Sequence, residues 1–387
     1  MEAESLAHRA SKRPSVSVIM AVHDARVHLC RAVESVLAAD AVAVQVVIVD
    51  CASNDGTAAL AARMAERDIR IDAIRIDVPD PASGLDRGLK IARGTYCMVM
   101  GQDDWFASHG LTRLRMLAET SDLELCVPEL SVDIIRTSGE RTSIKRRVDA
   151  PASKSAGEFH RRMSAMIESG VFDSVRGKLL RRDRVEELGL SLAELSGDLD
   201  FMVAYVESLE RVGFASGSCY HLTLHARPPQ GSAASRYPRC LRDHELLLGL
   251  AGKWEMLDNR EFMTAVHRRY LSGIIACIEQ TCASGARLCA PERNARIRYM
   301  LEERATRESI LALHDRNRDF GFMYVPLARS NVSACCMGVR LVSFMRSSRL
   351  PLAPVLRDAN VAWESALCAI GEGSPDGCKS YLEGDRA

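Results

Sequence analysis

The sequence predicts an α/β fold, in which a mostly parallel sheet is flanked by helices and followed by a helical C-terminal region. Between residues 16 and 100, short apolar runs rich in β-branched residues alternate with helical patterns. Such alternation requires crossover connections, which favour parallel strands with helices on the faces of the sheet. Beyond residue 237 the apolar residues recur at helical spacing.

The individual elements follow from the period of the apolar residues. Runs that are too short for a buried helix predict strands at 16–22, 45–49, 73–78 and 96–100. Apolar positions that recur on one face predict helices at 25–39, 57–66 and 84–92, the second of them capped by Ser53 or Asn54. The Arg-, Lys- and Ser-rich stretch 140–165 is expected to be a loop over the sheet, and helical patterning returns at 181–188 and 198–209.

Composition and charge exclude several classes of protein. In 387 residues, 51 Lys and Arg balance 51 Asp and Glu, so the chain has no basic excess that would support nucleic-acid binding. The 13 cysteines are scattered without a CxxC pair, which predicts a reducing compartment and no structural zinc. Residues 1–14 lack the apolar core of a signal peptide, and no uncharged stretch approaches the roughly 18 residues that span a bilayer. We therefore expect a cytoplasmic protein.

The acids that follow the predicted strands are the candidates for chemistry. Ligands of parallel sheets bind outside the carboxyl ends of the strands. Asp103 and Asp104 come directly after the fourth predicted strand, in the segment GQDDW. Two adjacent acids near a core need compensation, which a divalent cation that also holds a diphosphate can supply. The alternative is a solvated turn whose acids cap the following helix.

A second acidic segment, VDCASNDGT, follows the second predicted strand. Asp50 would end this strand and could face the same crevice as Asp103. Turn chemistry explains the same residues, since Asp, Ser, Asn and Gly link strands to helices. No GxGxxG or GxxxxGKS/T loop follows any strand, so a phosphate ligand would be neutralised by metal and side chains rather than by a glycine-rich backbone.

Two later segments leave alternatives open. His221 and His225 alternate with apolar residues in CYHLTLHA, which favours a strand with an outward histidine face over metal ligation. The stretch 337–350 interleaves apolar residues with arginines. It predicts either a core-facing helix with exposed arginines or a helix lying on an anionic membrane surface.

Residues 14–106 resemble the nucleotide-sugar-binding half of a family 2 glycosyltransferase of the GT-A fold. The matching pieces stand in the family's order and spacing: PSVSVIMAVHDA, ESVL, VDCASNDGT, SGLDRGLKIARGTY and GQDDW. The resemblance continues more weakly to about residue 236, through GKLLRRDRVEELGL, GDLDF and HARPPQGS. It divides the chain into a polar tail (1–13), a donor-binding half (14–120), an acceptor-binding half (121–236) and a helical region of unknown role (237–387).

The resemblance implies an inverting glycosyltransferase of the bacterial polysaccharide type. It would move a sugar from a nucleotide-sugar donor to a glycan or lipid-linked glycan, with peripheral association at the inner face of the membrane. Asp103 corresponds to the last acid of the family's DxD motif, which binds manganese or magnesium on the donor diphosphate, with Asp104 beside it. Asp198 corresponds to the general base. The resemblance places the following residues at the nucleotide-sugar: His23, Asp24, Asp50, Ser53, Asp86, Gln102 and Arg227.

The chemistry of glycosyl transfer requires these two kinds of acid. Positive charge grows on the sugar ring as its bond to the diphosphate breaks, much as in glycoside hydrolysis. A bound cation stabilises the leaving diphosphate, and a positioned carboxylate takes the proton of the acceptor hydroxyl. Asp103 and Asp198 supply this set. Asp198 could also open a helix as its N-cap, a role that is compatible with that of a base.

The sequence also departs from the family's pattern. Gly101 replaces the first acid of the DxD motif, Cys51 replaces the second acid after strand two, and Gly197 replaces the Glu before the base. These departures motivate an alternative, a non-catalytic sugar-nucleotide-binding or scaffold protein on the same fold. A nucleotidyltransferase is a further alternative, but AVHDA lacks the basic, Gly-rich loop that such an enzyme needs.

Overall fold

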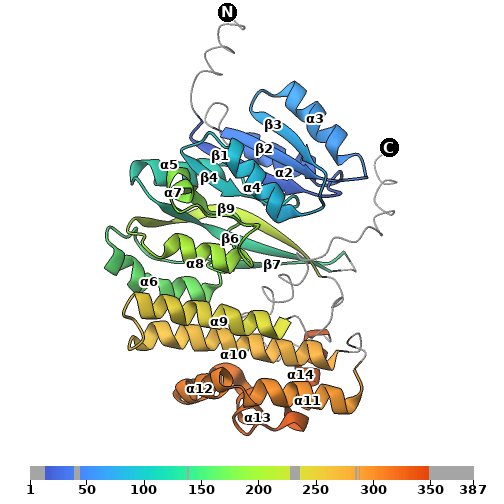
Figure 1. Cartoon of the computed structure of the whole chain (residues 1–387), viewed down its shortest axis with the longest axis vertical. Coiled ribbons are helices and arrows are strands. Elements are labelled where there is room, and N and C mark those ends of the chain that lie inside the picture. Colours follow the sequence, from blue (N-terminus) through green and yellow to red (C-terminus); the bar gives the residue numbers. More distant parts are fainter. Residues whose placement is uncertain are drawn as a thin grey trace, which may run out of the picture.

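The structure, a computed structural model, describes residues 14–38, 44–136, 139–226, 236–283, 286 and 288–347. The molecule is built in three tiers (Figure 1). The first strands and helices form one end, residues 105–226 form the middle, and the helices from residue 236 onward form the other end.

One mixed sheet runs through the first two tiers. The strands of the described chain lie in the order β3-β2-β1-β4-β8-β6-β9-β5, and β7 pairs with β6 off this path. Strands β1 to β4 pair in parallel, whereas β8 runs antiparallel to both β4 and β6. The first four strands are β1 (Val16–Val22), β2 (Val44–Cys51), β3 (Ile71–Ile76) and β4 (Tyr96–Val99). The predicted fold class is therefore confirmed.

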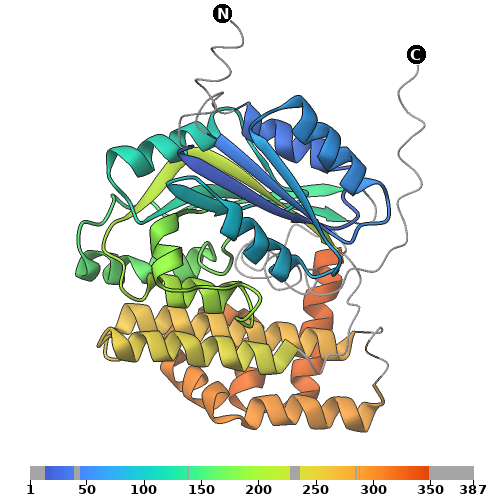
Figure 2. The same cartoon turned by 45° about the horizontal axis from the view of Figure 1, so that its top comes forward.

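Helices cover both faces of this first part of the sheet, so that β1 and β2 are almost entirely buried. The helices are α2 (Leu29–Leu37), α3 (Thr57–Arg67) and α4 (Pro81–Ile91). Right-handed crossovers put α2 and α3 on one face and α4 on the other, and Figure 2 shows α4 in front of the strands.

All predicted elements of this first part form, with shifts at their ends. β3 begins two residues before the expected start. α4 begins at Pro81 because the side chain of Asp80 caps it, accepting hydrogen bonds from the amides of Ala82 and Ser83. α3 is capped by Gly56, at φ +92°, and not by Ser53 or Asn54.

The middle tier contains two elements in a stretch for which the sequence predicted a loop. Residues 140–165 were expected to be a loop, and this expectation is wrong, since strand β7 and helix α6 form there. β7 is an edge strand with exposed Arg, Thr, Ser and Lys side chains, so its sequence lacks an apolar alternation. The elements of this tier are β5 (Trp105–Phe106), α5 (Gly110–Thr120), β6 (Leu125–Arg136), β7 (Arg141–Arg146), α6 (Ala156–Ser169), β8 (Leu179–Arg181), α7 (Arg182–Glu187), α8 (Asp198–Val206) and β9 (Val212–Ala226).

The third tier is helical, as the sequence predicted. It has its own hydrophobic cluster, in which Val339 of the last helix is buried, and this agrees with the core-facing interpretation of that helix. In the described ranges no helix combines the length and the apolar character that crossing a membrane requires. The elements are α9 (Arg236–Lys253), α10 (Arg260–Cys282), α11 (Ala290–Glu302), α12 (Arg304–Ala312), the 3-10 helix η2 (His314–Met323), α13 (Tyr324–Ala328) and α14 (Val332–Ser347).

A buried cluster of charges joins this helical tier to the middle tier. Arg269 of α10 donates hydrogen bonds to Asp173, at 2.9 Å, and to Asp243 of α9, at 3.1 Å. Burial alone would lower the pKa of Arg269, but the two carboxylates more than offset this effect and raise it. Asp173 stands immediately before the segment 174–178, which contributes to the candidate site described below.

We expect Arg269→Met to lower the free energy of unfolding by about 3 to 5 kcal/mol, because it leaves two buried carboxylates without a partner. Urea denaturation measures this loss. The control is Arg260→Met, since the ion pair of Arg260 with Asp315 is largely exposed and its loss should cost less than about 1 kcal/mol. If both variants lose the same free energy of unfolding, the buried charge cluster does not stabilise the contact between the tiers as described.

Candidate active site

The carboxyl ends of β1, β2 and β4 meet at one edge of the sheet, because these strands are parallel neighbours. The segments that follow them carry most of the residues that the sequence predicted for a site. Several of these residues tie the segments to one another. The amide of His23 donates to Gln102 Oε1 at 2.9 Å, and the amide of Asp24 donates to Ser53 Oγ at 3.0 Å. His23 Nδ1 also lies 2.7 Å from the carbonyl oxygen of Cys51.

Asp50, at the end of β2, is buried and only partly satisfied. Its Oδ2 atom lies 3.3 Å from Nη1 of Arg75 in β3 and accepts a weaker hydrogen bond from the amide of Ser53. Its Oδ1 atom is buried, and no described residue donates a hydrogen bond to it. A buried acceptor without a donor costs free energy, so this oxygen marks a place where a ligand N–H group would be stabilising.

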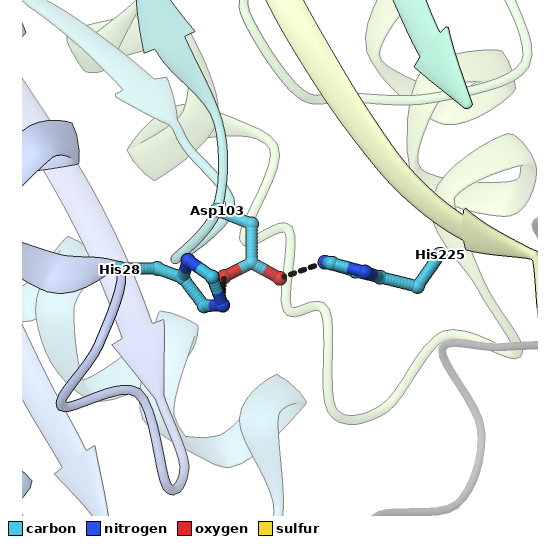
Figure 3. A group of neighbouring side chains, drawn as sticks. All are labelled: His28, Asp103 and His225. Atoms are coloured by element: carbon cyan, nitrogen blue, oxygen red, sulfur yellow. Dashed lines mark hydrogen bonds and ion pairs between the residues drawn. The ribbon is translucent and has the colours of Figure 1, made fainter. Parts of the chain in front are cut away.

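Asp103 lies between two histidines from distant parts of the chain (Figure 3). Its Oδ2 atom is 3.1 Å from His225 Nε2 in β9, and its Oδ1 atom is 3.9 Å from His28 Nε2, just before α2. One ligand atom from each of the three residues falls within 4.8 Å of the others, which is close enough to hold one metal ion. Burial raises the pKa of Asp103, but His225, His28 and Arg176 more than offset this effect and lower it.

Asp104, its neighbour, points into the protein and is fully buried. Its carboxylate accepts hydrogen bonds from the amides of Gly101 and Thr223, the hydroxyl of Tyr220 and, at 3.2 Å, Nη1 of Arg176. The sequence predicted Asp104 as a second metal ligand, but its oxygens are already engaged within the core. We therefore leave it out of the metal site.

The residue in place of the family's first DxD acid has no room for a side chain. A Cβ atom on Gly101 would lie 2.6 Å from Oδ2 of Asp104 and 2.8 Å from Nη1 of Arg176. Both distances are shorter than real Cβ contacts allow. The paired side chains of Asp104 and Arg176 thus fill the space beside residue 101.

Asp198, the predicted base, is the first residue of α8. Its Oδ2 atom accepts hydrogen bonds from the hydroxyl of Ser174, at 2.7 Å, and the amide of Val175, at 3.2 Å. Oδ1 accepts none from the described residues. Gly197 occupies the N-cap position of α8, and no side chain caps this helix. The contacts of Asp198 are therefore those of a fixed carboxylate with one open oxygen, and not those of a helix cap.

Asp103 and Asp198 act on the same guanidinium group. Burial lowers the pKa of Arg176, but the charges of Asp104, Asp198 and Asp103, among others, more than offset this and raise it. The backbone of Arg176 forms a parallel bridge with Val99 at the end of β4. The side chain of Arg176 pairs with Asp104, next to Asp103, and its amide donates to Ser174 Oγ, which bonds to Asp198, so Arg176 connects the segments that carry the two acids.

The remaining predicted residues have other positions. Asp86 of α4 accepts hydrogen bonds from the side chain of Ser191 and from the amides of Leu192 and Ala193, so it anchors the loop that leads to Asp198. Arg227 lies outside the described residues.

The structure adds four residues that sequence reasoning did not place in the site: His28, Arg75, Arg176 and His225. Strand β9 does form around the histidines, and His221 packs on Trp105 and bonds to Asp133, as an ordinary strand residue does. His225, however, faces Asp103. No local pattern distinguishes these four residues, because each acquires its role from a partner far away in the sequence.

The fold and the acids at the edge of its sheet define a GT-A type domain. Residues 17–189 match the model of the glycosyl transferase family 2. This part of the chain belongs to that family, which confirms the resemblance seen in the sequence.

Curated relatives and solved structures agree with this assignment. Over 121 residues the chain is 31% identical to the succinoglycan biosynthesis protein ExoO of Rhizobium meliloti (strain 1021), a match that covers 31% of this chain and 34% of ExoO. It is 23% identical to the uncharacterized glycosyltransferase EpsJ of Bacillus subtilis (strain 168), over 60% of this chain and 66% of EpsJ. The chain thus spans only about a third of the first of these relatives.

Among solved structures, the chain is similar in fold to residues 1–349 of TarS from S. aureus in complex with UDP-GlcNAc. The TM-score is 0.56 at 13% sequence identity, and the match covers 88% of this chain and 95% of that one. At this identity the similarity establishes the fold, including the helical region that follows the sheet.

The fully buried Lys178 contacts Ser174, a residue that holds Asp198. Its burial also makes the free energy of unfolding depend on pH. Its Nζ atom donates to the carbonyl oxygen of Ser174, the residue whose hydroxyl bonds to Asp198. Burial lowers the pKa of Lys178 from 10.5 to about 7. Between these two values the unfolded chain binds more protons than the folded chain, so the free energy of unfolding rises with pH in this window.

From pH 7 to pH 9 we expect this contribution to amount to about 2 kcal/mol in the wild-type protein. Lys178→Met should lack it, so the difference in stability between the two proteins changes by that amount. Urea denaturation of both proteins at the two pH values measures the change. If the difference in free energy of unfolding between the two proteins is the same at pH 7 and pH 9, the lowered pKa of Lys178 is refuted.

Proposed function

We propose that this chain is an inverting glycosyltransferase that moves a sugar from a nucleotide-sugar donor to a glycan or lipid-linked glycan acceptor. The observation that carries the proposal is that Arg176 links the segments of the two acids, since its side chain pairs with Asp104, the neighbour of Asp103, and its amide donates to Ser174 Oγ, which bonds to Asp198. One acid beside a cation site and one with an open oxygen are the minimum set for direct displacement at the anomeric carbon.

The residues present fit a divalent cation. His28, Asp103 and His225 would hold it, and the buried Oδ1 atom of Asp103, which lacks a hydrogen bond, would gain a partner. When bound, the cation supplies positive charge to the leaving diphosphate. Two imidazoles and one carboxylate suit manganese better than magnesium, which prefers oxygen ligands.

The end of the site at Asp50 fits a nucleobase with an imide group, such as uracil. The open Oδ1 atom of Asp50 can accept a hydrogen bond from the imino N–H group, and Arg75 can donate to a neighbouring carbonyl oxygen. Cytosine has no imino N–H group. The UDP-GlcNAc bound to TarS, a protein of similar fold, also supports a uridine donor.

In the proposed reaction the acceptor oxygen attacks the anomeric carbon while the bond from that carbon to the diphosphate oxygen breaks. The electron pair stays on the diphosphate, and the proton of the acceptor hydroxyl goes to Oδ1 of Asp198. Ser174 and Val175 hold the other oxygen of Asp198, so that the open oxygen is fixed in direction. The biosynthetic relative ExoO supports an enzyme of polysaccharide synthesis, and the scattered cysteines without a CxxC pair support a cytoplasmic one.

A second candidate is a sugar-nucleotide-binding or scaffold protein without transfer activity. Gly101 and Cys51 favour it, because each stands where the family carries an acid. The two candidates differ in whether sugar is transferred once the donor has bound.

We expect Asp103→Asn and Asp198→Asn each to reduce transfer at least 100-fold, because they remove the cation's carboxylate and the base. Nucleotide release from a donor panel with manganese measures transfer, and calorimetry measures donor affinity. Donor affinity should fall in Asp103→Asn and persist in Asp198→Asn. If the wild-type protein binds a donor but releases no nucleotide with any acceptor extract, the scaffold candidate is the correct one.

The base-reading role of Asp50 predicts a change in nucleotide preference. We expect the wild-type protein to bind UDP at least 10-fold more tightly than CDP, and Asp50→Asn to lose most of this preference, since an amide can donate to cytosine as well as accept from uracil. Calorimetric titration with both nucleotides tests the expectation. An unchanged ratio in the variant would remove Asp50 from the base site.

A further inference from the structure

The space that a DxD acid would need is occupied by the ion pair of Asp104 with Arg176. Gly101 leaves no room for a side chain, and the nearest groups are the guanidinium of Arg176 and the carboxylate to which it is paired, Asp104. Relative to an acid at position 101, the glycine makes the end of β4 more positive by one charge, and the guanidinium of Arg176 lies beside it. The change in charge falls next to Asp103, where a donor diphosphate would be bound.

The position of Arg176 is fixed by its backbone. The residue bridges Val99 of β4, and the next amide, that of Gly177, donates to the carbonyl oxygen of Val99 at 2.9 Å. The amide of Arg176 itself donates to Ser174 Oγ, the hydroxyl that also bonds to Asp198. The guanidinium is therefore held at the strand end rather than on a free loop.

The guanidinium of Arg176 has N–H donors that form no hydrogen bond with the described residues. Only Nη1 forms a hydrogen bond with a described residue, Asp104, and Nε is buried without one. About 15% of the side chain is exposed. A planar guanidinium with open donors matches two oxygens of a phosphate group, which a point charge cannot do.

We propose that Arg176 binds the donor diphosphate, in the place where a second metal-binding carboxylate would otherwise stand. The proposal rests on the proposed function, and it makes Arg176 a catalytic residue. When the bond from the anomeric carbon to the diphosphate oxygen breaks, the electron pair stays on that oxygen, and the N–H donors of Arg176 stabilise it without transferring a proton. Part of the positive charge at the leaving group is thus supplied by the chain itself.

The binding of UDP and UMP in the presence of EDTA tests this role, because the two nucleotides differ by one phosphate and the chelator removes the contribution of any cation. Calorimetric titration of Arg176→Lys should show UDP affinity reduced at least 10-fold and UMP affinity changed less than 2-fold. Lysine keeps a positive charge beside Asp104, so we expect the variant to fold. The matched control is Arg184→Lys, since Arg184 of α7 is about as exposed as Arg176, forms an ion pair with Glu124, and should leave both affinities unchanged when it is replaced.

A second variant covers the case in which Arg176→Lys does not fold. The double variant Asp104→Asn/Arg176→Met removes both buried charges together, so that neither is left uncompensated, and it should also lose the preference for UDP over UMP.

UDP affinity equal to that of the wild-type protein, or equal losses for UDP and UMP, would overturn the proposal and leave Arg176 a structural partner of Asp104. If the wild-type protein binds none of UDP, GDP, CDP and ADP, the proposed function itself fails, and this inference fails with it. Wild-type UDP binding with an unaffected variant removes this inference alone.

Discussion

The geometry of the candidate site depends on satisfying one buried charge, that of Asp104. A carboxylate in a core is tolerable only when it is fully paired. Its partners come from the turn after β4, from Tyr220 and the following residues of β9, and from Arg176. These contacts bring together three segments that are far apart in the sequence. The groups proposed for function stand on the same segments, since Asp103 is the next residue and His225 lies further along β9.

The sequence is sufficient for the parts of the fold that depend on local periodicity. The strands and helices up to residue 100 were predicted with shifts of a few residues, because buried strands and amphipathic helices differ clearly in the spacing of apolar side chains. The same principle explains the failure at β7, an edge strand with polar side chains. Asp50 and Asp103 were candidates because they follow predicted strands, Asp198 came from the resemblance, and the fold places Asp50 and Asp103 at one edge of the sheet and Asp198 beside the end of β4.

The sequence could not assign the partners of these acids. Asp103 and Asp104 are adjacent and chemically identical and both belong to the turn after β4, in which the amide of Asp104 donates to the carbonyl oxygen of Gly101, yet one faces the crevice and the other the core. Which of the two turns inward is decided by β9 and Arg176, which arrive from more than 70 residues away. The role of His28 could not be assigned from the sequence either, because it depends on Asp103 lying opposite.

The unsatisfied atoms of the site favour a working enzyme over a protein that retains only the fold. Oδ1 of Asp50 and Oδ1 of Asp103 are both buried without a hydrogen bond from the described residues, at a cost of about 1 to 3 kcal/mol each. Selection for folding alone would remove such costs, whereas selection for a ligand would keep them. Nucleotide binding explains these two oxygens, but it gives no reason for Asp198, whose carboxylate is fixed on one side and open on the other. A protein that transfers what it binds accounts for all three.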